Sequence, residues 1–163
     1  MLMLGFVIEA GNIWLGRVEL IHALEAGALA GAKAWGDGAD DAATRSAARV
    51  VAQEFAQANT VTGATITIAP NDNLSGLDND GNNNLDCNNG DVVLGNLSGG
   101  VFNTTVGNPM AANERAVLVR GAFNVAGITS LFNPPYVVTG QAIARADGAG
   151  NVRLVEVTTI ICP

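Results

Sequence analysis

The sequence predicts an α+β fold, in which a long amino-terminal helix and a second helix precede a small antiparallel β-sheet. Three observations predict this class. Residues 1–35 contain no proline and place apolar residues at helical spacing. Helical spacing returns at 40–59, after a break at Gly36-Asp37-Gly38. From residue 62 onward the apolar period changes from 3.6 to 2, which is typical of strands.

The amino-terminal helix is expected to stand apart from the rest of the chain. A helix of this length spans ~50 Å at roughly 1.5 Å per residue, which is long for one small domain to cover. Small residues recur at every fourth position, at Ala23, Gly27 and Gly31, and this spacing lets two helix backbones approach closely. We therefore expect residues 1–36 to pack against copies of themselves or a membrane, ahead of a globular domain at 37–163. The alternative is a long core helix with small residues at a crossing.

The globular domain is expected to begin with the helix at 40–59. Asp40 or Asp41 would cap its start, and Asn59 would stop it. The apolar stripe predicted for burial is Ala47, Val50, Val51, Phe55 and Ala58, while Arg45, Arg49, Gln53 and Gln57 are expected to face water. Strands follow at 62–68, 91–97, 100–106, 115–123, 136–146 and 151–161, with a hairpin turn between the last two. We expect these strands to form a mostly antiparallel sheet that one helix covers.

Composition argues against two functional classes. The net charge is −7, and the eight Lys and Arg residues are scattered, whereas a nucleic-acid interface needs a clustered basic face. The single histidine, His22, lies among packing residues of the long helix, so Ser-His-Asp and Cys-His arrangements lack a base. The chain has no P-loop and no dinucleotide-binding fingerprint. We therefore expect neither a nucleic-acid partner nor an enzyme.

The two cysteines, Cys87 and Cys162, lie far apart in the sequence. Two thiols alone cannot form a closed zinc site. In an oxidising compartment they would form a disulfide that closes a loop of roughly 75 residues and stabilises the fold by on the order of 4 kcal/mol. The alternative is a pair of buried free thiols.

An Asn- and Asp-rich stretch at 71–91 predicts a structural calcium site. It places oxygen-bearing side chains at alternate positions around Gly81, and calcium takes 6–8 oxygen ligands. This spacing resembles the first two-thirds of an EF-hand loop, although Asn89 stands where the EF-hand has its twelfth-position Glu. The predicted ligands are Asp78, Asp80, Asn82, Asn84, Asp86 and Asp91. The alternative is a solvated loop without metal, because Asn and Asp also favour turns.

Residues 8–34, IEAGNIWLGRVELIHALEAGALAGAKA, resemble the start of TadE/TadG-like proteins of the tight-adherence (Tad) pilus system, which is type IV-like. The matching positions are Glu9, Gly11, Arg17, Glu25 and the Ala-Leu-Ala-Gly-Ala block at 28–32. The later segments DVVLG, RAVLVRG, LFNPP and VVTGQAIARA occur in a similar order. The sequence departs from the family in lacking its longer apolar stretch ahead of Glu9. It also lacks the Asp-x-Ser-x-Ser metal motif of larger TadG members.

This resemblance implies a pilin-like homo-oligomer, with its amino-terminal helix in the inner membrane before assembly and in the core of an extracellular filament afterwards. Glu9 would then be a buried carboxylate that needs a partner, such as Arg17 or Lys33 of a neighbouring subunit or an N-terminal amine. The residues expected at subunit contacts are Glu9, Gly11, Arg17, Ala23, Gly27 and Gly31. The alternative function is a secreted or surface-anchored, calcium-stabilised binding module for glycans or a surface layer, which would stay monomeric.

Overall fold

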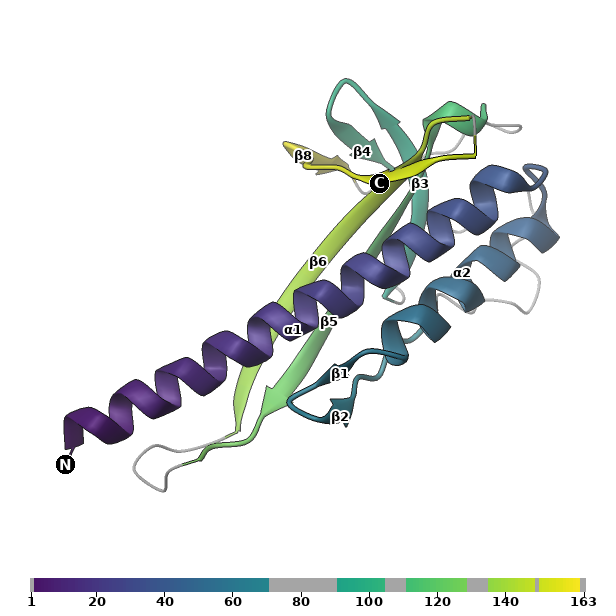
Figure 1. The fold of residues 1–163 in the computed structure, drawn as a ribbon. Helices are drawn as coiled ribbons and strands as arrows, with labels where there is room; N and C mark the ends of the chain where they lie inside the picture. The colour runs from purple at the N-terminus through teal and green to yellow at the C-terminus, as the bar shows by residue number, and fades with distance from the viewer. Residues whose placement is uncertain (1, 71–90, 105–110, 129–134, 149, 162–163) are drawn as a thin grey trace.

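The computed structural model describes residues 2–70, 91–104, 111–128, 135–148 and 150–161. Two helices pack on one face of a sheet, so the α+β class is confirmed (Figure 1). The elements are α1 Leu2–Asp37, α2 Ala42–Gln57, β1 Thr60–Val61, β2 Ala64–Thr65, β3 Val92–Ser98, β4 Val101–Asn103, the 3-10 helix η3 Ala112–Glu114, β5 Arg115–Val125, β6 Tyr136–Ala146, β7 Val152–Leu154 and β8 Thr159–Ile161.

Six of the strands form one sheet in the order β7-β6-β5-β3-β4-β8. Its pairings are antiparallel except that β8 runs parallel to β4, so the sheet is mixed and not purely antiparallel. The single strand expected at 151–161 is two short strands, β7 and β8, which lie at opposite ends of the sheet order. The strand expected at 62–68 is also wrong, because only Ala64–Thr65 pairs, and it does so with β1 in a separate hairpin.

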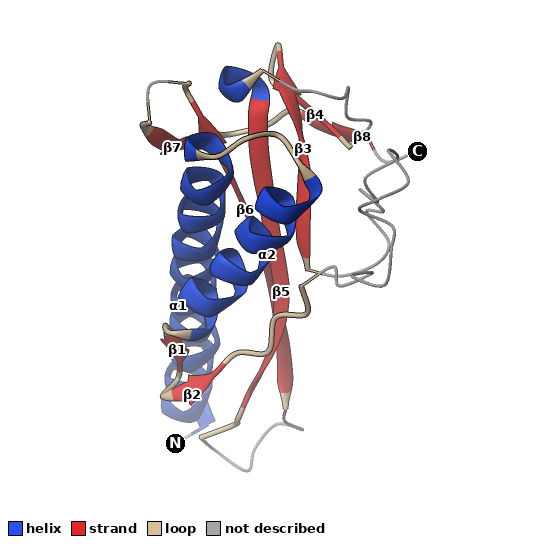
Figure 2. Cartoon of the chain, turned by 90° about the vertical axis from the view of Figure 1, so that its right-hand side faces the viewer, coloured by secondary structure: helices blue, strands red, loops and turns tan. Residues whose placement is uncertain are grey.

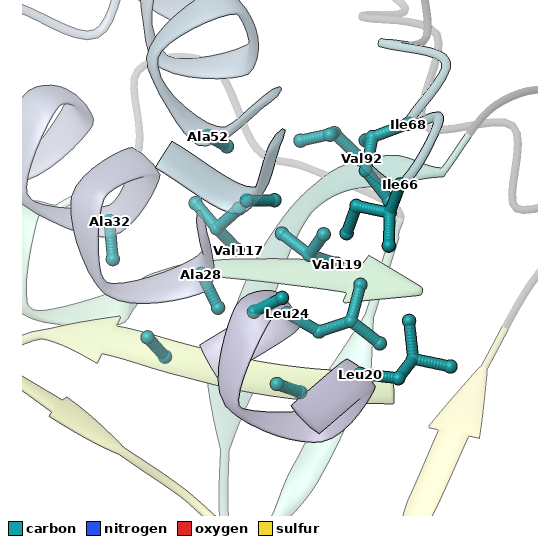
Figure 3. Close-up of a cluster of buried hydrophobic side chains, with 14 of the residues drawn as sticks. Leu20, Leu24, Ala28, Ala32, Ala52, Ile66, Ile68, Val92, Val117 and Val119 are labelled. Carbon is teal, nitrogen blue, oxygen red and sulfur yellow. The ribbon is translucent and has the colours of Figure 1, made fainter. Parts of the chain in front are cut away.

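The helix α1 shares a hydrophobic core with the rest of the chain. It lies along the β5-β6 hairpin, whose two strands have 11 residues each, and Figure 2 shows both helices on the same side of the sheet. Apolar side chains of α1, α2 and the sheet meet in one cluster, including Leu24, Ala52 and Val117 (Figure 3). Residues 1–36 therefore do not stand apart, because the long hairpin is present to cover one face of the helix.

Small residues allow the close contact between α1 and α2. A Cβ added at Gly27 would lie 2.7 Å from the carbonyl oxygen of Ala52, and one added at Gly31 would lie 2.8 Å from the Cβ of Ala52. Ala48, Ala52 and Ala56 supply the matching face of α2. The four-residue spacing on both helices therefore brings two helices of the same chain together, as the alternative of a long core helix anticipates.

The buried face of α2 differs from the expected one. Arg45 and Arg49 are each only 2% exposed, whereas Val50 and Phe55 are exposed. The close approach of α1 admits only alanine-sized side chains at the centre of the contact, so the larger apolar residues turn outward. Gln53 and Gln57, expected in water, donate side-chain hydrogen bonds to the carbonyl oxygen of Ile68 at 2.8 Å and 3.3 Å.

The turn between α1 and α2 explains why two buried arginines, Arg45 and Arg115, are tolerated. Asp41 caps α2 by accepting a hydrogen bond from Thr44 N at 2.8 Å. Oδ1 of Asp40 accepts hydrogen bonds from Arg45 Nε at 2.7 Å and from Trp35 Nε1 at 3.0 Å. The guanidinium groups of Arg45 and Arg115 lie 6.0 Å and 5.9 Å from the centroid of the Trp35 ring. A carboxylate and an aromatic ring thus replace the water that these charges lose.

Candidate functional site

The amino-terminal half of α1 presents the largest group of exposed apolar side chains in the described part of the chain. Their exposed fractions range from 43% to 87%. We call this surface the α1 patch, and its members are Met3, Leu4, Phe6, Val7, Ile8, Trp14 and Leu15. Gly11 lies among them, and a Cβ added there would have no atom within 4 Å. The surface is therefore apolar and open.

The opposite face of the same helix segment is attached to the end of β5. Asn12 Nδ2 donates a hydrogen bond to the carbonyl oxygen of Ala126 at 2.8 Å, and the N–H of Ile128 donates to Glu9 Oε2 at 3.1 Å. Gly16 lets the backbone approach the sheet, because a Cβ added there would lie 2.6 Å from Val125 Cγ2. Glu9 and Gly16 are seven residues apart, about two helical turns, so they lie on one face. These contacts fix the rotation of the helix and turn the α1 patch outward.

Glu9 is buried beside the only tyrosine of the chain. It is 2% exposed, and it lines a hollow of about 420 Å³ together with Phe6, Trp14, Arg17 and Tyr136. Burial, and secondly the negative charge of Glu9, raise the pKa of Tyr136 above its ordinary value of 10.0. Tyr136 therefore stays neutral at physiological pH, and it adds no second negative charge next to the carboxylate.

The structure gives Glu9 a hydrogen-bond partner within its own chain. Its carboxylate accepts the Ile128 N–H of its own chain. Lys33, one of the expected partners, instead forms a salt bridge with Asp37 at 2.6 Å and donates to the Gly150 carbonyl oxygen at 2.9 Å. Arg17, the other expected partner, is exposed at the rim of the hollow. Ile128, just after β5, thus supplies one partner within the chain, and the expected contact of Glu9 with a neighbouring subunit stays a prediction.

Three of the residues predicted at subunit contacts lie inside the chain. Ala23, Gly27 and Gly31 are buried within the chain, the two glycines against α2. Of the predicted packing residues, Gly11 and Arg17 are exposed. The spacing of small residues correctly predicted a close helix contact, but spacing alone does not say which helix is the partner. Sequence reasoning also missed the extent of the α1 patch. The sequence signal available for predicting the patch was the polar pair Glu9 and Asn12, because these residues mark the inward face of α1 and the patch lies opposite them.

Most of the predicted calcium site lies outside the described residues, namely Asp78, Asp80, Asn82, Asn84 and Asp86. The same is true of the predicted disulfide between Cys87 and Cys162. Asp91 is described, and its Oδ2 accepts a hydrogen bond from Ala69 N at 2.8 Å. Across the described ranges, no three His, Cys, Asp or Glu side chains are grouped closely enough to hold a metal ion.

Within the segments that the structure describes, no helix combines the length and the apolar composition that a membrane span requires. In α1 the charged residues Glu9, Arg17, Glu19, Glu25, Lys33 and Asp37 recur along the helix.

Comparison of the chain with protein-family models, with curated proteins and with solved structures finds no match.

Proposed function

We propose that this chain is a structural subunit of a pilin-like extracellular filament, and that subunits assemble through the α1 patch. The observation that carries the proposal is the outward-facing apolar surface of α1 from Met3 to Leu15. Exposed apolar surfaces of this kind mark interaction sites in soluble proteins. The resemblance of residues 8–34 to TadE/TadG-like proteins is consistent with this function and with a location at the cell surface.

The chemistry of the α1 patch favours a second helix of the same kind as its partner. Between Met3 and Gly16 the only charged side chain is that of Glu9, which lies on the inward face. Burying one large apolar side chain contributes roughly 1.5–3 kcal/mol, so several of them buried together would offset the cost of association. Gly11 leaves open space at the centre of the surface, which allows another helix backbone to come close.

The rest of the chain would then lie on the outside of the assembly. The sheet and α2 cover only the inward face of α1, which leaves the α1 patch accessible to neighbouring subunits. The acidic character of the chain, with its net charge of −7, favours solubility of this outer part.

The first experiment is electron microscopy of native surface material, with mass spectrometry to identify this chain in it. We expect regular filaments made mainly of this chain. Surface material that contains the chain but no filaments would overturn the proposal.

A second experiment compares three variants of the purified chain by negative-stain microscopy and light scattering. Phe6→Gln and Val7→Gln should abolish filament formation, because each places a polar amide in the contact. Phe55→Gln is the matched control, because Phe55 of α2 is 54% exposed, close to the 60% of Phe6, yet lies outside the α1 patch. Normal filaments from Phe6→Gln and Val7→Gln would show that another surface drives assembly.

A further inference from the structure

The strand β6 has an outer edge that is only partly paired. On one side β6 pairs with β5, and on the other side it pairs with β7 only at Ala144–Ala146. Just beyond β7, the N–H of Val155 donates to the carbonyl oxygen of Ile143 at 2.9 Å. From Tyr136 to Ala142, no strand within the described residues lies on the side of β6 opposite β5. The stretch of β6 from Tyr136 to Ala142 therefore forms an open edge of the sheet.

The backbone groups along this edge point away from the sheet. In an antiparallel pair, alternate residues direct their N–H and C=O groups to the same side. Because the Ile143 carbonyl oxygen points outward to Val155, the outward residues of the open stretch are Val137, Thr139 and Gln141. In the part of the chain that the structure describes, their outward groups have no hydrogen-bond partner.

The side chains on the edge provide none of the usual protection against strand pairing. Proteins protect free edges with charged residues, prolines or bulges. Val137, Thr139 and Gln141 are exposed and uncharged, and the pairing of β5 with β6 is continuous across this region. A hollow of about 560 Å³ adjoins residues 139–141 and is also lined by Arg17 and Ile21 of α1, by residues 120–122 of β5 and by Asp91, so it extends from the edge across the sheet.

We propose that this edge pairs with the same edge of a second copy of the chain, antiparallel and about a two-fold axis at Thr139. In this register Thr139 lies opposite its own copy, and Val137 lies opposite Gln141. Each of the three outward residue pairs then exchanges two backbone hydrogen bonds. The two six-stranded sheets become one continuous sheet.

Several features favour a second copy as the occupant. The open stretch from Tyr136 to Ala142 is centred on Thr139, so an identical antiparallel strand fills it without meeting Val155. β6 itself contains no acidic residue, so the paired strands place no negative side chains directly opposite one another. Self-complementary two-fold contacts are the commonest arrangement in homo-oligomers. Two charged residues of α1 lie near the edge, Arg17 beside residues 139–141 and Glu25 beside Gln141 and Ala142. Arg17 is exposed and long enough to remain in solvent.

The test measures the mass of the full chain by sedimentation and light scattering. Phe6→Gln and Val7→Gln are combined as the background, so that the α1 patch does not associate. We expect twice the chain mass of 16.6 kDa. Thr139→Lys should return the mass to that of one chain, because it places two like charges on the two-fold axis. Thr139→Pro should do the same by removing one outward N–H without removing a bond to β5.

Thr139→Val is the matched control, because it keeps the backbone N–H and the β-branched shape, and it should stay dimeric. Circular dichroism of each variant checks that the fold is retained. A background chain that remains monomeric as its concentration is raised overturns the proposal, and so does a Thr139→Lys variant that stays dimeric. A background chain that remains monomeric would favour a strand from another protein as the occupant of this edge.

The register has its own test by cysteine cross-linking, with Cys87 and Cys162 replaced by Ser. Thr139→Cys should cross-link efficiently with a short thiol-specific reagent, because the two copies of residue 139 are opposite one another. Val137→Cys should not, because its two copies are four residues apart along the strands, roughly 13 Å. Equal cross-linking of both variants would overturn the register. These cysteine variants also carry Phe6→Gln and Val7→Gln, so the α1 patch does not associate and failure of strand pairing is distinguishable from failure of filament formation.

Discussion

Adding one methyl group at two different glycines of α1 should change the stability of the chain in opposite directions. Gly27 faces α2, where an added Cβ would lie 2.7 Å from the carbonyl oxygen of Ala52 and 2.9 Å from the Cβ of Ala56. Both neighbours belong to the backbone or to the short side chains of α2, so the two helices must separate to make room. Gly11 lies in the same helix, but an added Cβ there would have no atom within 4 Å.

The magnitudes follow from two opposing terms. Replacing Gly by Ala inside a helix stabilises it by about 0.5–1 kcal/mol, because the unfolded chain loses conformational freedom. At Gly11 only this term applies, so Gly11→Ala should raise the melting temperature by about 1–4 °C. At Gly27 the overpacked contact costs about 2–3 kcal/mol, which exceeds the gain. The net loss is about 1–2 kcal/mol, or a melting temperature lower by about 2–8 °C.

The assay is thermal unfolding for the melting temperature and urea unfolding for the free energy, both followed by circular dichroism at a protein concentration low enough to prevent self-association. Both variants make the same chemical change in the same helix, so each serves as the control for the other. An increase in stability for Gly27→Ala similar to that for Gly11→Ala would refute the packing of α1 against α2 described above.

Three other predictions concern single side chains. Thr62 has a φ of +49°, which is unfavourable for a β-branched residue, so Thr62→Gly should raise the free energy of unfolding by about 1 kcal/mol in urea titrations. Glu9→Ala should lower that free energy by about 1–3 kcal/mol and speed hydrogen exchange at the Ile128 amide, because this N–H loses its acceptor. The raised pKa of Tyr136 means that the unfolded chain releases the phenolic proton first, so stability should fall as pH rises above 10.0.

Each of these predictions has a contradicting result. Unchanged or lower stability of Thr62→Gly would mean that the turn is not strained. Unchanged exchange at Ile128 would show that Glu9 does not hold this amide. Tyr136 is the only tyrosine, so its tyrosinate absorbance reports one group directly. A midpoint at or below 10.0 in the folded chain would contradict the burial of its hydroxyl next to Glu9.

The sequence predicted the two helices and the longest strands well, because their signals are local. The break at 36–38 lies at the end of α1, and the Asp pair at 40–41 supplies the cap of α2. The predicted strand at 136–146 coincides with β6. The prediction for 62–68 failed because Ile66 and Ile68 are both buried without pairing in a strand, with Gln53 bound to the Ile68 carbonyl oxygen instead of a neighbouring strand.

The candidate site was predictable only in part. Sequence analysis singled out Glu9 as a buried carboxylate, and it is buried, but its partner lies 119 positions away at Ile128. No local pattern encodes a contact over that separation. The same limit explains why the buried face of α2 was predicted incorrectly. The sequence favours the stripe of larger apolar residues, but α1 comes so close at Gly27 and Gly31 that only alanine-sized side chains fit between the helices.

What the sequence alone determined is therefore the set of elements, because helical period, strand period, caps and breaks depend on residues close to one another. The tertiary structure decided which face of each element is buried, because burial depends on which distant element arrives to cover it. In α1 the long β5-β6 hairpin covers the face that contains Glu9 and Gly16 and leaves Met3 to Leu15 exposed on the other. The surface proposed for assembly is the part of α1 that this hairpin does not cover.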